Sequence, residues 1–103
     1  MGKRSRTERR EAEREAAKLT RTRMKLAALE PGGHPERPIE VASASIIEPH
    51  ASSMPCAACG EQGLRVEEHA ADLPRGLRVV HVLCQRCGTR REVFFRIRTV
   101  LPS

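Results

Sequence analysis

The alternation of hydrophobic and polar residues divides the chain into three parts, of which the first is a helix candidate. Residues 5–30, SRTERREAEREAAKLTRTRMKLAALE, are rich in helix-forming residues and contain no Gly or Pro. Ser5 and Glu8 have the spacing of a capping box, and a Pro-Gly-Gly sequence follows the segment. This pattern predicts one long helix. Its thin apolar stripe is too short to specify a coiled coil and consists of Ala12, Ala16, Leu19, Leu26 and Leu29.

The second and third parts differ in composition from the helix. Residues 31–53 are rich in Pro, Ser and Ala, which predicts an extended linker. Beyond them, three short runs alternate in polarity or are rich in β-branched residues: LRVEEHA, LRVVHVLC and REVFFRIR. Pro74 and Gly76 predict a hairpin turn between the first two runs. We therefore predict a basic helix or tail over 1–30, a linker over 31–53 and a three-stranded antiparallel sheet within 54–103.

The two strand runs nearest the C-terminus are apolar on both faces. In the middle run, Leu77, Val79 and Leu83 share one face and Val80 and Val82 the other. In the last run, one face carries Val93, Phe95 and Ile97, and the other carries Glu92, Phe94, Arg96 and Arg98. A sheet this small normally has one wet face, so the second apolar patch needs a cover. The linker supplies Val41, Ile46 and Ile47, and we expect Ile46 or Ile47 to lie extended against Phe94.

The four cysteines form two copies of Cys-x-x-Cys-Gly, at Cys56, Cys59, Cys84 and Cys87. Such thiols can form two disulfides, a redox pair or one metal site. A thioredoxin-like redox motif requires a βαβ unit, and no such unit accompanies these cysteines. In a reducing compartment, paired Cys-x-x-Cys motifs are typical of metal ligands. Two thiolates spaced in this way hold one edge of a tetrahedron, and the glycine after each pair permits a positive φ.

The ligand set favours one structural Zn²⁺. Four cysteines close the coordination sphere and leave no open position for water. Iron in a rubredoxin-like site is the chemical alternative. His81 lies three residues before Cys84 and is a spare ligand candidate, but four cysteines already complete the site.

These residues resemble the zinc ribbon family with a four-cysteine site, which includes small bacterial proteins. The resemblance covers residues 54–99 and rests on CAACG, a two-strand spacer and CQRCG followed by a third strand. It implies a three-stranded antiparallel zinc ribbon that holds zinc through the four cysteines. The spacing is also similar to ribbons of transcription elongation factors that carry two acids and a proline at the hairpin tip. Here Asp72 is present but Leu73 stands at the second acidic position, so only the fold and the ligands carry over.

Charge suggests the kind of partner. The chain has a formal net charge of +6, and residues 1–30 hold ten basic and five acidic side chains. Arginine suits phosphate partners, although GC-rich codon usage also enriches arginine. We expect nucleic acid, or a ribonucleoprotein or transcription machine, as the partner. The candidate nucleic-acid-binding residues are Arg78, Arg86, Arg90, Arg91, Phe94, Arg96 and Arg98.

Several alternatives remain open at the level of sequence. Phe94 can pack against Val80 and Val82 instead of stacking on a base. The N-terminal helix can be a solvated tail or a basic arm that contacts nucleic acid or an acidic partner. A protein–protein adaptor that docks through the helix and the Phe94 face is the second functional hypothesis.

An enzyme is not expected from this sequence. It has no Ser-His-Asp motif and no Gly-rich phosphate loop, and Glu67 and Glu68 should point to opposite faces of a strand. No small-molecule substrate is therefore expected. No signal peptide or membrane-spanning run is visible, so we expect a soluble, cytoplasmic protein without a membrane partner.

Overall fold

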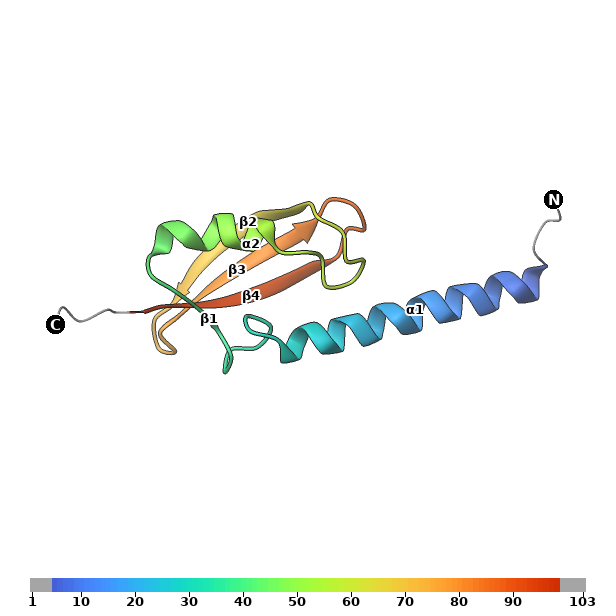
Figure 1. The fold of residues 1–103 in the computed structure, drawn as a ribbon, viewed down its shortest axis with the longest axis horizontal. Coiled ribbons are helices and arrows are strands. Elements are labelled where there is room, and N and C mark those ends of the chain that lie inside the picture. The colour runs from blue at the N-terminus through green and yellow to red at the C-terminus, as the bar shows by residue number, and fades with distance from the viewer. Residues whose placement is uncertain (1–4, 99–103) are drawn as a thin grey trace.

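The computed structural model describes residues 5–98, which form a long helix followed by a small mixed sheet (Figure 1). Helix α1 spans Arg6–Leu29. Ser5 Oγ accepts the Glu8 N–H at 3.2 Å, and the Glu8 carboxylate accepts the Ser5 N–H at 3.3 Å. The predicted capping box is thus confirmed, and it satisfies two backbone donors that the first turn would otherwise leave unpaired. Residues 1–4 and 99–103, at the ends of the predicted regions, lie outside the described part of the chain.

The sheet has four strands in the order β1-β4-β3-β2. Strands β2 (Leu64–Asp72), β3 (Leu77–Cys84) and β4 (Arg90–Ile97) pair antiparallel, as the three strand runs predicted. A fourth strand, β1 (Ile39–Val41), pairs parallel with β4. The prediction of a strictly three-stranded antiparallel sheet was therefore wrong, because a short apolar piece of the linker extends the sheet at the β4 edge.

The rest of the predicted linker is also structured. After β1 the chain forms a 3-10 helix, η1 (Ala44–Ile46), and a short α-helix, α2 (Ile47–Ser53). Pro49 lies in the first turn of α2, where its missing N–H costs no helical hydrogen bond. Ile47 and Ala51, four residues apart on one helix face, are both fully buried. The prediction of an extended linker was wrong for residues 44–53. Proline is common both in linkers and in the first turn of a helix, so composition alone does not distinguish the two.

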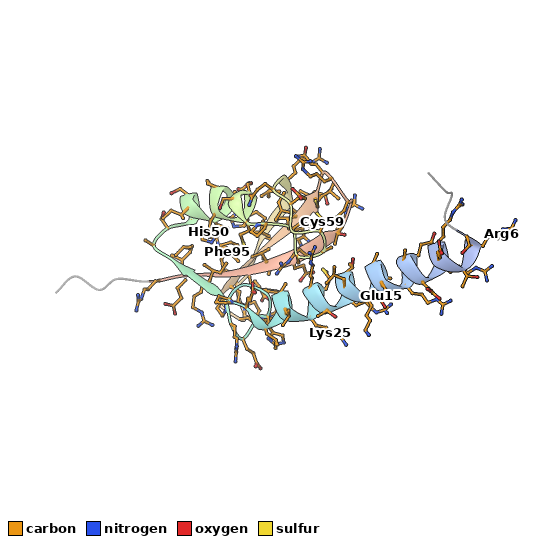
Figure 2. All side chains as sticks on the ribbon, turned by 45° about the vertical axis from the view of Figure 1, so that its right-hand side comes forward. Arg6, Glu15, Lys25, His50, Cys59 and Phe95 are labelled. Atoms are coloured by element: carbon orange, nitrogen blue, oxygen red, sulfur yellow. The ribbon has the colours of Figure 1, made fainter. Side chains whose placement is uncertain are left out.

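Helix α2 lies over one face of the sheet, which we call the covered face (Figure 1). Its core joins Ile47 and Ala51 of α2 to the buried strand residues Val80, Val82, Val93 and Phe95. Figure 2 shows Phe95 beside His50 of α2, with ring centroids 5.7 Å apart in an edge-on arrangement. Burial of a side chain as large as Phe95 contributes about 1.5–3 kcal/mol.

The opposite face, called the second face, carries its own small cluster of Leu77, Val79 and Phe94. Phe94 therefore packs with Val79, its cross-strand partner in the β3–β4 pairing, and not with Val80 and Val82. Ile47 packs with Phe95 on the covered face, and Ile46 is 43% exposed. The expected contact of either isoleucine with Phe94 was wrong, because the chain crosses to the other side of the sheet after β1.

Helix α1 projects beyond the end of the sheet that carries the cysteine turns (Figure 1). None of its residues is buried, and the molecule extends 68 Å along its longest axis. Only the C-terminal turns pack against the sheet, where Met24 contacts the covered-face core. Within residues 5–98, none of the helices is long and apolar enough to span a bilayer.

Candidate metal centre

The β2–β3 hairpin brings the two cysteine turns together. The first turn, residues 56–60, precedes β2, and the second, residues 84–88, joins β3 to β4. Leu64 at the start of β2 pairs with Cys84 at the end of β3, so both turns meet at the same end of the sheet. The Gln85 N–H donates to the Gly63 carbonyl at 3.1 Å and ties the second turn to the chain entering β2.

The two turns have the same backbone hydrogen bonds. In the first, the Gly60 N–H donates to the Cys56 carbonyl at 2.8 Å, and the Cys56 N–H donates to the Glu61 carbonyl at 2.9 Å. In the second, Gly88 and Thr89 take the corresponding places around Cys84, with the same two distances. Both glycines have φ of 77°, a conformation that glycine adopts without strain. The repeated sequence motif therefore folds into a repeated structure.

The four sulfur atoms gather into one cluster. All four Sγ atoms lie within 4.8 Å of one another, and the cysteines are free rather than paired in disulfides. Cys56 and Cys87 bring their sulfurs to 3.6 Å, and Cys59 and Cys84 to 3.7 Å. Four thiolates around a tetrahedral zinc, each at about 2.3 Å, are about 3.8 Å apart. The sulfur spacing thus fits one tetrahedral metal ion.

The surroundings of the thiols differ in ways that matter for ionisation. The pKa of Cys87 is lowered to about 6, chiefly by the Thr89 hydroxyl, 3.2 Å from its sulfur, and then by the Thr89 amide. The pKa of Cys84 is also lowered, chiefly by the amide of Cys87. The Glu61 amide lowers the pKa of Cys59, but burial and the three neighbouring thiols outweigh it and raise this pKa to about 12. A divalent cation would remove the repulsion that keeps the last thiol protonated.

The cluster is buried on one side and open on the other. Cys56 and Cys84 are 4% and 0% exposed and belong to the covered-face core, whereas Cys87 is exposed. A metal ion held here would therefore cross-link the two cysteine turns next to the core of the sheet, to which Cys56 and Cys84 belong. A chelator in solution can reach the open side.

Helix α1 contacts the first cysteine turn. The Arg23 guanidinium donates to the Cys59 carbonyl at 3.1 Å, and Met24 packs against the core that contains Cys56. Arg91 lies beneath this contact, where burial lowers its pKa despite the opposing attraction of Glu30. The docked end of α1 is thus linked to the metal centre, while the rest of the helix is not.

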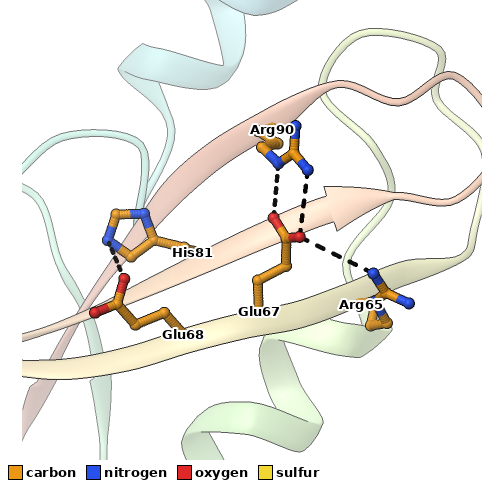
Figure 3. Close-up of polar contacts among 5 residues, drawn as sticks. All are labelled: Arg65, Glu67, Glu68, His81 and Arg90. Atoms are coloured by element: carbon orange, nitrogen blue, oxygen red, sulfur yellow. Dashed lines mark hydrogen bonds and ion pairs between the residues drawn. The ribbon is translucent and has the colours of Figure 1, made fainter.

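His81, the spare ligand candidate, does not belong to the sulfur cluster and lies on the second face beside Glu68 (Figure 3). Its Nε2 is 3.8 Å from a Glu68 carboxylate oxygen. Glu67 and Glu68 also share this face, because a β-bulge between Val66 and Glu68 adds one residue to β2. The expectation that the two glutamates point to opposite faces was therefore wrong. The bulge has no signal in the local sequence.

The arginines predicted for nucleic-acid binding do not gather on one surface. Arg90, Arg96 and Arg98 lie on the second face with Phe94, and Arg78 and Arg91 lie on the covered face. Arg86 projects from the second cysteine turn, where its Nε donates to the Gln62 carbonyl at 3.3 Å.

Acidic side chains also occupy the second face. Arg90 donates to Glu67 at 2.9 Å, and Arg98 lies 3.7 Å from Glu40 (Figure 3 shows the first pair). Phe94 is 7% exposed, so its ring is not available for stacking on a base. This surface is mixed in charge, and its binding role stays a prediction.

No protein-family model, curated protein or solved structure matches this chain.

Proposed function

We propose that this chain is a non-enzymatic zinc protein of the zinc-ribbon type that binds nucleic acid through α1. The sulfur geometry supports the zinc, because four thiolates form a closed tetrahedral set that suits a structural ion. Zinc bound by Cys56, Cys59, Cys84 and Cys87 would supply folding free energy and fix the cysteine turns relative to each other. Iron fits the same thiolates, and metal analysis distinguishes the two ions.

The observation that carries nucleic-acid binding is a row of cations along α1. Five basic side chains follow one another at intervals of four, four, three and four residues, which places them on one side of a helix. The row is about 22 Å long at 1.5 Å per residue. All five side chains are exposed. We call this row the basic face, and it consists of Arg10, Arg14, Lys18, Arg21 and Lys25.

The basic face makes no ion pair among the described residues, although Glu11, Glu13 and Glu15 lie among its first three cations. Residues 16–29 contain four basic and no acidic side chains. The ion pairs among residues 5–98 join side chains outside α1. A line of exposed cations without ion-pair partners on a projecting helix can bind the phosphates of a nucleic acid. Such binding would release the counterions held by the phosphates and would be favourable for that reason.

An adaptor role for α1 is the second candidate. Leu19, Leu26 and Leu29 are 53%, 56% and 64% exposed and lie on one side of the helix, next to the basic face. A partner helix could cover them. On the Phe94 face, the other docking surface expected for an adaptor, the apolar side chains Leu77, Val79 and Phe94 are already buried.

Fluorescence anisotropy with labelled DNA and RNA tests the proposal. We expect binding that weakens steeply with salt, and we expect the variant Arg14→Gln/Lys18→Gln/Arg21→Gln to lose about three units of the slope of log K against log salt concentration. Glutamine keeps the helix propensity and removes the charge.

The matched control Arg9→Gln/Arg65→Gln/Arg75→Gln removes the same net charge from exposed positions off the basic face. It should keep most of the affinity. Equal losses in the two variants, or binding that is insensitive to salt, would contradict the proposal. Absence of binding to both nucleic acids would also contradict it, and this result would favour the adaptor role.

A further inference from the structure

We infer that the nucleic acid held by the basic face is double-stranded DNA, with α1 lying along the major groove. This inference rests on the proposed function and adds the class of nucleic acid to it. It follows from three properties of the described residues: the lack of an exposed aromatic surface, the regularity of α1, and the room around its projecting part.

Single-stranded nucleic acid is disfavoured by the lack of a stacking surface. Proteins that hold single strands stack the bases on aromatic side chains in addition to gripping the phosphates. The chain contains no Trp or Tyr and only two Phe. Phe94 and Phe95 are 7% and 0% exposed. A single strand would therefore be bound through its phosphates alone, and ordering it would cost conformational entropy.

A duplex matches the regularity of the basic face. Helix α1 has no Gly or Pro within its 24 residues and begins with a complete capping box, so its cations are held in a straight row. Double-stranded DNA is itself a straight, regular array, with one negative charge per roughly 1.7 Å of its axis. A fixed row of cations can contact such an array without either partner having to change shape.

The dimensions favour DNA over RNA as the duplex. An α-helix with its side chains is about 10–12 Å wide, and the major groove of B-DNA is about 12 Å wide. The major groove of an RNA duplex is deep and narrow and does not admit a helix. A groove-bound α1 therefore discriminates between the two duplexes by shape.

The sheet does not block access to the projecting part of α1. Figure 2 shows Arg6 and Glu15 on the portion of the helix that stands away from the sheet, and Lys25 close to the docked end. The contacts with the first cysteine turn come from Arg23 and Met24. The first three cations of the basic face precede that region by one turn or more, so a groove can enclose them.

The test is a comparison of three labelled probes of equal length and matching sequence: duplex DNA, duplex RNA and single-stranded DNA. Full-length, metal-loaded protein should bind duplex DNA at least about ten times more tightly than either other probe. Its salt slope should lie between about −3 and −5, because each of the three to five cations that contact phosphates contributes about −0.9. The variant Arg14→Gln/Lys18→Gln/Arg21→Gln should lose this preference, and Arg9→Gln/Arg65→Gln/Arg75→Gln should retain it.

The outcomes separate the inference from the proposed function. Binding of all three probes with equal affinity, lost in the basic-face variant, would overturn the inference and keep nucleic-acid binding. Tighter binding of RNA duplex or of the single strand would do the same. Absence of binding to every probe would overturn both. Circular dichroism of each variant, with the helical signal unchanged, shows that any loss comes from charge and not from unfolding of α1.

Discussion

Removal of the metal is expected to unfold the sheet while α1 keeps much of its helical signal. Two of the four cysteines, Cys56 and Cys84, are core residues, so the ion and the core depend on each other. The core contains few large side chains, and a domain of this size rarely folds on hydrophobic burial alone. A structural zinc contributes on the order of 10 kcal/mol of apparent binding free energy, which exceeds the stability of most small domains.

Circular dichroism during titration with a chelator measures this effect. The β-sheet signal should disappear as metal is withdrawn and return when zinc is added back. Cys84→Ser should mimic chelation, because it removes a buried thiolate. His81→Ala is the matched control, since His81 is three residues away in the same strand but lies next to Glu68 on the second face. An unchanged thermal transition after complete metal removal would contradict the account.

Replacement of Ile47 by alanine is expected to have the second-largest effect. Ile47 is fully buried against the sheet in the same core as Val80 and Phe95. Loss of a buried isoleucine side chain to alanine costs about 2–5 kcal/mol. The free energy of unfolding of the metal-loaded protein, measured in urea, should fall by this amount while the metal content stays at one ion per chain.

Ile46→Ala provides the comparison, because Ile46 is the neighbouring residue and is 43% exposed. A change at such a position is usually within about 0.5 kcal/mol. If both variants lost the same stability, α2 would not be anchored through Ile47 as the structure shows.

The sequence predicted the elements that depend on local chemistry. The capping box of Ser5 and Glu8, the hairpin turn at Gly76 and the two glycine-closed cysteine turns are each encoded within about six residues, and each has a physical requirement that few residue types meet. The clustering of the sulfurs was also predictable, because a two-strand spacer must return the chain to its starting end. The structure confirms all of these features.

The features that sequence reasoning missed depend on contacts distant in the chain. Strand periodicity correctly separated Phe94 from Phe95, but it does not say which face α2 covers. That choice is made by the parallel pairing of β1 with β4. The bulge that turns Glu67 and Glu68 to the same side is likewise a property of strand pairing. The face that α2 covers is decided where the β1–α2 segment crosses the sheet, and no local pattern in residues 31–53 encodes the direction of that crossing.

The alignment of cations on α1 was missed for a different reason. The sequence allowed a basic arm over residues 1–30 as one hypothesis, but the arginines of REVFFRIR alternate with apolar residues and favoured binding residues on the sheet. In the structure, acidic partners occupy much of that face, as the pairs Arg90–Glu67 and Arg98–Glu40 show. Helical periodicity applied to the cations of residues 10–25 would have found the basic face.

Native mass spectrometry of the purified protein tests the central claim, a single metal ion held by the four cysteines, most directly. The folded chain should carry one zinc ion, Cys84→Ser should carry none, and His81→Ala should carry one. A folded chain whose mass corresponds to metal-free protein, whether with four free thiols or with two disulfides, would contradict the claim.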